Sequence, residues 1–167
     1  TLTAAIGQSY DLFTPLQLAN YIATLVGGGQ HYEAHLLKNV KSYDNSSVIY
    51  AYDKAPLNTV EMSGSTVQAV KEGMHNLTTG SLSYYFSNCV VSAGAKTGTA
   101  ETGIANTNNG VFVCFAPYDD PQIAVAVVIE KGGSGAALAS TAVDIVNSYF
   151  SQEEIGAVVI GENTLLK

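Results

Sequence analysis

The spacing of apolar residues predicts a first amphipathic helix near the start of the chain. Thr14 can serve as its N-cap, Pro15 suits the first helical position, and Gln17 completes a capping box. The glycines at 27–29 are typical of a helix end. The predicted buried stripe has helical spacing and consists of Leu18, Ile22, Leu25 and Val26.

Two further helices are predicted by the same periodicity. One begins with a capping box at residues 65–68 and ends at Gly80. Its expected buried positions are Val67, Val70, Met74 and Leu77. The other follows the glycine-rich segment 132–135 and closes the domain near Phe150. Its expected inward side chains are Leu138, Ala142, Ile145, Val146 and Tyr149. In the tail, residues 151–167, a small hairpin is expected over 157–166.

Between the helices, the pattern predicts antiparallel strands. Residues 31–53 indicate a peripheral hairpin around a polar turn at 44–47. Residues 91–100, 111–116 and 123–129 predict a three-stranded meander, and the continuous apolarity of the last one indicates burial on both faces. The expected fold class is therefore α+β, an antiparallel sheet flanked by helices.

Composition narrows the class of protein. The chain has 167 residues, 47% of them hydrophobic and only 13% charged, which suits one domain or a large part of one. A net charge of −7 argues against nucleic-acid binding. No apolar run approaches the roughly 20 residues of a membrane span, and no signal peptide is visible. Cys89 and Cys114 follow no ligand or disulfide pattern, so we interpret them as buried thiols and expect no cofactor.

A metal site is the alternative to consider for the first hairpin. His31, Glu33 and His35 alternate, so a strand would place all three on one face. A solvated strand face has the same pattern, and the spacing is not the helical His-Glu-x-x-His. We assign no metal ligand.

The stretch Ala-Gly-Ala-Lys-Thr-Gly-Thr-Ala-Glu at residues 93–101 carries the candidate chemistry. Lys96 supplies a positive charge for a carboxylate or for the proton relay of a serine. Thr97 and Thr99 can donate charge-assisted hydrogen bonds to a carboxylate, and the Thr99 N–H is a candidate oxyanion donor. Gly98 would let an extended peptide lie alongside the strand. The alternative interpretation is an edge strand with a surface lysine.

Three stretches, in the same order, resemble one protein family. Residues 96–101, Lys-Thr-Gly-Thr-Ala-Glu, resemble the third motif of the high-molecular-mass penicillin-binding proteins. Residues 6–19 contain Ile-Gly-Gln and Thr-Pro-Leu-Gln-Leu-Ala, which resemble a segment that precedes that motif in the family, with Ser9 where the family usually has glycine. Residues 115–127 resemble the last two strands of its transpeptidase domain. The resemblance extends to Phe150.

The resemblance implies that residues 1–150 are the C-terminal portion of a class B-like transpeptidase domain. Such enzymes cross-link peptidoglycan stem peptides through an acyl-serine intermediate and react with β-lactam antibiotics. Lys96 and the Thr99 N–H would be catalytic, and Lys96, Thr97, Gly98 and Thr99 would bind the substrate. The protein would be anchored at the extracytoplasmic face of the bacterial membrane, through an anchor absent from this chain.

The nucleophile expected from the resemblance is absent from these 167 residues, because they contain neither Ser-x-x-Lys nor Ser-x-Asn. Tyr43-Asp44-Asn45 matches a variant of the second motif, but it falls in a hairpin turn on the wrong side of the first helix in family order. We expect the missing motifs before Thr1, on the N-terminal half of the same domain. The chain by itself is therefore expected to be inactive.

Other functions remain compatible with the residues. A β-lactam sensor or a β-lactamase shares Lys-Thr-Gly, although residues 14–19 and 115–117 fit the biosynthetic group better. A non-catalytic extracellular module that binds peptide or β-lactam would account for the missing nucleophile.

The strand at 122–130 would need a neighbour at its outer edge, since an exposed apolar edge promotes aggregation. We expect the upstream segment, a second copy or residues 157–166 to cover it.

Overall fold

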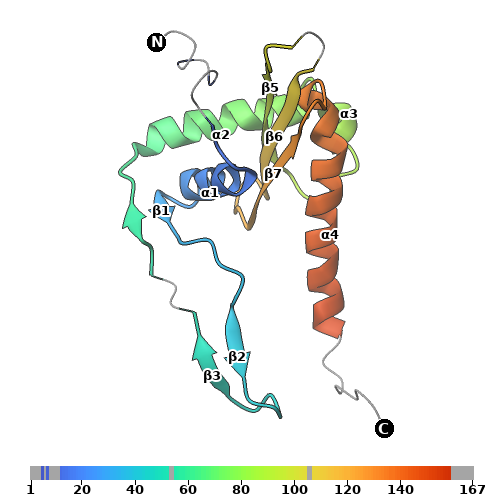
Figure 1. Ribbon diagram of the computed structural model, residues 1–167. Coiled ribbons are helices and arrows are strands. Elements are labelled where there is room, and N and C mark those ends of the chain that lie inside the picture. The colour runs from blue at the N-terminus through green and yellow to red at the C-terminus, as the bar shows by residue number, and fades with distance from the viewer. Residues whose placement is uncertain (1–4, 6, 8–11, 53–54, 105–106, 159–167) are drawn as a thin grey trace.

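The computed structural model describes residues 5, 7, 12–52, 55–104 and 107–158, with side chains up to residue 151. The first half contains a helix, four short strands and then two further helices, and the second half contains the main sheet and the closing helix (Figure 1). In chain order the elements are α1 (Pro15–Val26), β1 (Gln30–His31), β2 (Asn39–Lys41), β3 (Val48–Ala51), β4 (Asn58–Thr59), α2 (Gly64–Thr79), α3 (Ser83–Phe86), β5 (Gly94–Ala100), β6 (Asn109–Ala116), β7 (Ile123–Ile129), the 3₁₀ helix η2 (Gly135–Leu138) and α4 (Ala139–Val158).

The main sheet is the predicted antiparallel meander, in the order β5-β6-β7. Its register pairs Lys96 with Val113 and Gly98 with Val111 across β5 and β6. Helices cover both faces, and Figure 1 shows α4 on the opposite side of the sheet from α1. The expected α+β architecture is confirmed.

Alternation along β6 divides the core between the two faces. Phe115 is fully buried and packs with Ile22 of α1 and Met74 of α2. Phe112 and Cys114 have the opposite parity and pack with residues of η2 and α4. Burying a side chain of the size of phenylalanine stabilises a fold by about 1.5–3 kcal/mol. The central strand therefore holds the two helical layers together.

The first helix begins and ends where the sequence predicted. The Thr14 hydroxyl accepts a hydrogen bond from the Gln17 N–H at 3.2 Å, and the Thr14 N–H donates to Gln17 Oε1 at 2.8 Å. Ile22 and Leu25 are buried, and Gly27 is the C-cap. This capping box stabilises the start of α1, because both orphan donors are satisfied.

The second helix differs from the prediction at its start. It begins at Gly64 with Ser63 as N-cap, and Ser63 makes no side-chain capping bond. The capping box predicted at 65–68 was wrong, because Ser65 lies within the first turn, where its hydroxyl pairs with that of Ser63 at 2.8 Å. The buried residues are Met74 and Thr78, whereas Val70 is 41% exposed. The end at Gly80 is as predicted.

The peripheral hairpin is formed by β2 and β3, all of whose residues are exposed. It projects away from the main sheet (Figure 1). In its turn, the Asp44 carboxylate accepts hydrogen bonds from the Ser42 hydroxyl at 2.6 Å and from the Ser46 hydroxyl at 2.8 Å. These bonds stabilise the charged form and lower the pKa of Asp44 to about 2.

His31, Glu33 and His35, which were considered as metal ligands, do not lie in one strand. His31 lies in β1, which pairs with β4, and regular strand structure resumes only at Asn39. His35 stacks on Tyr52 with ring centroids 3.4 Å apart, and Glu33 accepts a hydrogen bond from the Tyr52 hydroxyl at 2.8 Å. Within the described ranges, no group of three or more histidine, cysteine or acidic side chains is placed to hold a metal.

Both cysteines are free thiols. Cys114 is fully buried at the centre of β6, and burial, reinforced by the nearby Cys89, raises its pKa to about 12. Cys89 is half-buried, and burial raises its pKa as well. The prediction of buried thiols thus holds fully for Cys114 and partly for Cys89.

The closing helix is longer than predicted. After η2, α4 continues to Val158, so residues 157 and 158 of the expected tail hairpin are helical, and residues 159–167 lie outside the described part. Leu138, Ala142 and Val146 point inward as predicted. Ile145 does not, since it is 40% exposed beside β7. None of the helices in the described ranges combines the length and apolarity needed to cross a bilayer.

Candidate active site

The strand that carries the candidate chemistry lies at an edge of the main sheet. β5 pairs with β6 on one side only, and within the described residues no strand pairs with its other side. Its backbone groups there can hydrogen-bond an added extended peptide. On the core side the strand is closely packed, since a Cβ on Gly94 would lie 2.5 Å from the Phe115 ring.

A groove of about 270 Å³ lies between β5, β6, α1 and α2. Lys96, Thr97 and Gly98 line it from the strand. Its other walls are mainly apolar and are formed by Leu18, Tyr21, Ile22, Leu25, Val70, Met74, Val111 and Val113. The structure thus brings three of the four predicted site residues to one groove, with one positive charge among mainly apolar walls.

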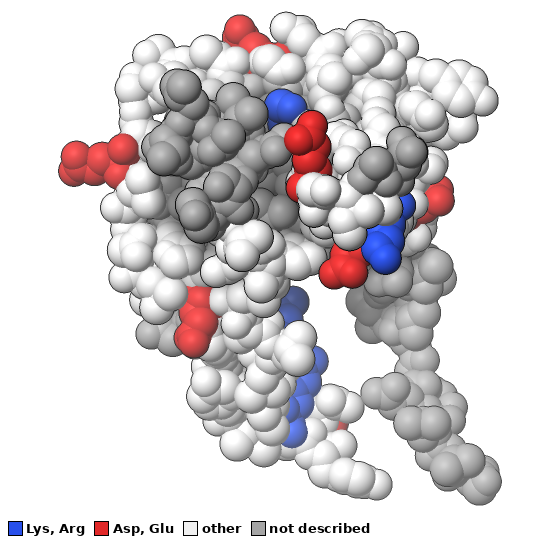
Figure 2. Space-filling view, turned by 45° about the horizontal axis from the view of Figure 1, so that its top comes forward, with Lys and Arg blue, Asp and Glu red and all other residues white. Residues whose placement is uncertain are grey.

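Lys96 is the charged residue of this groove. Its side chain is exposed, and Nζ donates a hydrogen bond to the Thr97 carbonyl at 2.5 Å. On the face shown in Figure 2, acidic side chains are scattered, and basic side chains gather mainly along the lower extension of the molecule. A lysine in this setting can attract an anionic group to the groove.

The side chain of Thr99 has a different environment. Its Oγ1 accepts a hydrogen bond from the Gly135 N–H at 3.3 Å, and Thr99 is not among the residues that line the groove. A hydroxyl that accepts from an N–H still has its own proton to donate. The contact with Gly135 therefore orients the Thr99 hydroxyl and leaves it able to bind a carboxylate.

Gly135 supports the strand from the other face of the sheet, a role that sequence reasoning missed. A Cβ at this position would lie 2.2 Å from the Gly98 carbonyl oxygen and 2.3 Å from that of Val111. Only glycine fits so close to the backbone. The signal in the sequence is the glycine-rich segment 132–135, which by itself indicates only the approach to the closing helix.

The Tyr43-Asp44-Asn45 sequence lies outside this site. It forms part of the turn of the β2–β3 hairpin, where the Tyr43 side chain is fully exposed. That hairpin projects away from β5 (Figure 1). The structure agrees with the expectation that this triplet is not the second catalytic motif.

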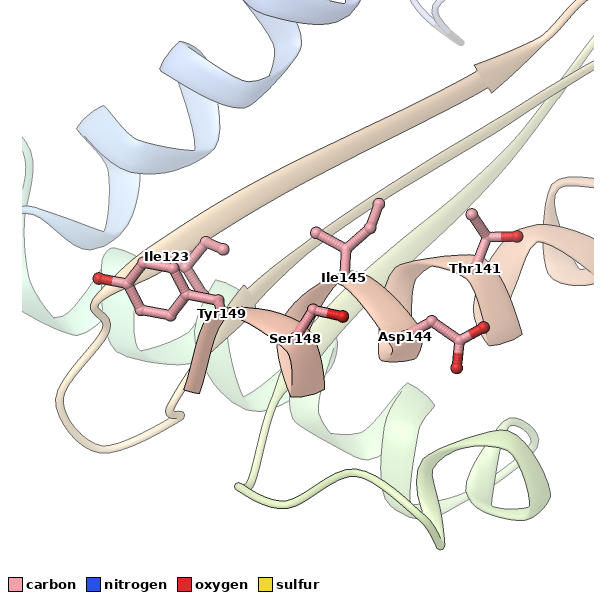
Figure 3. A pocket seen from close by; sticks show the side chains of 6 residues that line it. All are labelled: Ile123, Thr141, Asp144, Ile145, Ser148 and Tyr149. Carbon is pink, nitrogen blue, oxygen red and sulfur yellow. The ribbon is translucent and has the colours of Figure 1, made fainter. Parts of the chain in front are cut away.

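A second hollow, of about 410 Å³, lies where α4 passes the outer edge of β7. Figure 3 shows the side chains that line it, which are Ile123, Thr141, Asp144, Ile145, Ser148 and Tyr149. In the described part of the chain β7 pairs with β6 alone. Val125 is buried but Ile129 is 45% exposed, so the expected burial of this strand on both faces is incomplete.

Comparisons with known proteins point to one family. A family model described as the penicillin-binding protein transpeptidase domain matches residues 1–149. "Penicillin-binding protein 2A" of Bacillus subtilis is 32% identical over 181 aligned residues, which cover 99% of this chain and 24% of that protein. "Peptidoglycan D,D-transpeptidase MrdA" of Haemophilus influenzae is 27% identical, over 95% of this chain and 27% of that protein.

Solved structures agree with the sequence relatives. Penicillin-binding protein 2B of Streptococcus pneumoniae strain R6 has a TM-score of 0.73 and 29% identity, covering 84% of this chain and 25% of that one. An imipenem acyl-enzyme complex of penicillin-binding protein A from M. tuberculosis has a TM-score of 0.67 and 27% identity, covering 87% and 33%. This chain spans about a quarter of the length of the curated relatives that it matches.

Proposed function

Because the chain belongs to the penicillin-binding protein transpeptidase family, we propose that the protein is a peptidoglycan D,D-transpeptidase. It cross-links stem peptides through an acyl-serine intermediate. Residues 1–150 form the C-terminal portion of its catalytic domain, and the N-terminal half of that domain supplies the nucleophile.

The observation that carries this proposal is the groove beside the free edge of β5. Lys96, Thr97 and Gly98 line it together, and the strand edge can pair with an extended peptide. A peptide that pairs there places its terminal carboxylate near a lysine and two hydroxyls. Penicillin-type compounds carry a carboxylate and a reactive carbonyl, so they use the same groups.

Each residue of the strand has a proposed role. Lys96 polarises the cleft and contacts the carboxylate, while the hydroxyls of Thr97 and Thr99 bind it. The backbone N–H of Thr99 donates to the oxyanion, a contribution whose loss typically costs about 2.7–4 kcal/mol of barrier. Gly98 keeps the strand open to close approach of the substrate, since it has no side chain. A Cβ there would also crowd the Val111 Cβ, at 3.3 Å.

The N-terminal half of the same domain would pack against two open surfaces of this chain. The apolar walls of the groove offer a seat for the helix that carries the nucleophile, and the hollow beside β7 offers one for an upstream strand. Both would bury side chains that are half-exposed here, including Ile145. We place the intact protein at the extracytoplasmic face of the membrane, held by an upstream anchor, where its substrate is.

A non-catalytic module that binds peptide or β-lactam is the second candidate, and the absence of Ser-x-x-Lys in this sequence favours it. Fluorescent penicillin distinguishes the two functions. A protein that includes the residues encoded upstream of Thr1 should form a covalent, denaturation-resistant adduct, and the 167-residue chain should not. Failure of the longer protein to label, with binding that denaturation reverses, would support the module and contradict the enzyme.

A further inference from the structure

One face of α2 carries a row of polar side chains that the proposed chemistry does not use. They are Gln68, Lys71, His75 and Thr78, at the spacing that places residues on one side of a helix. All four make contacts with segments that border β5. This row lies next to the apolar positions from which the helix itself was predicted.

Two of these side chains bind the same backbone oxygen. His75 Nδ1 lies 2.9 Å from the Ala93 carbonyl oxygen. The Thr78 hydroxyl lies 2.8 Å from the same oxygen and 2.8 Å from the His75 carbonyl oxygen, so these two acceptors share its one proton. Because a carbonyl only accepts, Nδ1 carries the ring proton. Ala93 directly precedes β5 and stands three residues before Lys96. Ala93 and Thr78 are buried and His75 is half-buried, and all three line a hollow of about 300 Å³.

The same helix face is fixed to the turn after β6 through Tyr118. The His75 ring stacks on the Tyr118 ring with centroids 4.3 Å apart, and Gln68 Nε2 donates to the Tyr118 hydroxyl at 3.2 Å. Lys71 Nζ lies 5.3 Å from the centre of the same ring. Tyr118 in turn donates its backbone N–H to the Ser92 carbonyl at 2.9 Å. The contacts close a ring from α2 to the start of β5, to Tyr118 and back to α2.

This ring sets the distance between α2 and β5, which are two walls of the groove. Met74 of α2 lines the groove and lies so close to the strand that a Cβ on Gly94 would be 3.2 Å from its Cβ. Two donors on different side chains approach the Ala93 carbonyl oxygen, and together they restrict its direction more than one donor would. A shift of the strand start would be passed directly to Lys96 and Thr99.

We propose that His75 and Thr78 are positioning residues of the active site. They hold the start of β5 against α2, and so fix the width of the groove at Lys96 and the place of the Thr99 N–H. Neither residue touches the reacting groups. The effect on catalysis rests on the proposed function, whereas the effect on the strand does not.

Matched substitutions in the protein that includes the upstream residues test this proposal. Thr78→Val keeps the shape and removes the hydroxyl, and Thr78→Ser keeps the hydroxyl. His75→Phe keeps the stacking on Tyr118 and removes the donor, and His75→Asn keeps a donor near the place of Nδ1. Asn76→Ala alters an exposed side chain of the same helix that takes no part in this ring of contacts, and serves as the control.

The measured quantities are the acylation rate constant and the non-covalent affinity for benzylpenicillin, determined per titrated active site. A misplacement of about 1 Å can cost about 100-fold in rate, so Thr78→Val and His75→Phe should lower the acylation rate constant by about 10- to 100-fold and leave the affinity nearly unchanged. Thr78→Ser, His75→Asn and Asn76→Ala should acylate at nearly the wild-type rate. A merely structural role would lower only the melting temperature and the fraction of active protein.

Hydrogen exchange gives a readout that does not depend on activity. In Thr78→Val and His75→Phe, the β5 amides should lose protection relative to those of β7, and in Asn76→Ala they should not. Unchanged β5 protection, or unchanged acylation rates in both variants, would overturn the inference. If penicillin does not acylate the wild-type protein, the proposed function is wrong, and hydrogen exchange alone decides whether these residues hold the strand.

Discussion

The backbone N–H of Gly135 donates a hydrogen bond to the Thr99 hydroxyl at 3.3 Å, which joins η2 to the strand of the candidate site from behind. The two segments are distant in sequence, and their contact depends on the absence of a side chain at Gly135. The packing of η2 against the back of β5 therefore requires a glycine at position 135.

We expect Gly135→Ala to destabilise the protein by about 1–3 kcal/mol, the usual range for overpacking, because the new Cβ would meet two carbonyl oxygens. Gly73→Ala is the matched control. Gly73 lies inside α2, and a methyl group there would have nothing within 4 Å, so alanine should stabilise the helix by about 0.5–1 kcal/mol. Urea denaturation of both variants measures the two changes. Equal stability of the two variants would contradict the close packing at η2.

Lys96→Ala should separate activity from stability. The side chain is exposed and donates to the carbonyl of the next residue, so its loss should change the free energy of unfolding by less than about 0.5 kcal/mol. Acylation by penicillin of the longer protein should fall by about 100-fold or more, as expected for a preorganised charge. Lys96→Arg keeps the charge with a different geometry and should recover little of the rate. Full acylation of Lys96→Ala would contradict the role assigned to this lysine.

The two cysteines should differ in their reaction with a thiol reagent. Burial raises the pKa of Cys114 to about 12, so at pH 8 almost none of it is thiolate, and the reagent cannot reach it in the folded protein. Cys89 is half-buried and should react first, though more slowly than a free thiol. Cys89→Ser identifies the faster phase. If this variant still reacted rapidly under native conditions, the burial of Cys114 would be wrong.

The turn of the β2–β3 hairpin should respond to acid. The folded pKa of Asp44, about 2, lies below the ordinary value of 3.8. Its hydrogen bonds therefore stabilise the turn above pH 3.8 and lose that effect as pH falls through the folded pKa. NMR titration of the carboxyl carbon measures this. Ser42→Ala should move the midpoint upward, and a midpoint of 3.8 in the unsubstituted chain would contradict the turn geometry.

Local signals were sufficient to predict much of the fold. The capping box of Thr14 and Gln17 lies within one turn, and residues 123–129 form the uninterrupted apolar run that became β7. The failures came from contacts between distant segments. Ile145 has helical spacing with buried neighbours, yet it faces the hollow beside β7, and its exposure depends on what lies next to that strand.

In the candidate site too, local features were predictable and contacts between distant segments were not. The residue types and order in 96–99 predicted a strand that lines a groove, and residues 96–98 do so, because that chemistry is local. No comparable local pattern indicates that Gly135 supports Thr99, or that His75 and Thr78 share the carbonyl of Ala93. Those contacts join elements whose proximity is decided by the packing of the whole core.

The central claim is that β5 forms the peptide-binding edge of an active site whose reactive serine lies outside these 167 residues. Mass spectrometry of peptides from the penicillin-treated longer protein tests it most directly. We predict one penicilloyl adduct, on a serine upstream of Thr1 that is followed three residues later by lysine. An adduct on any residue between Thr1 and Lys167, or a protein that carries none, would contradict the claim.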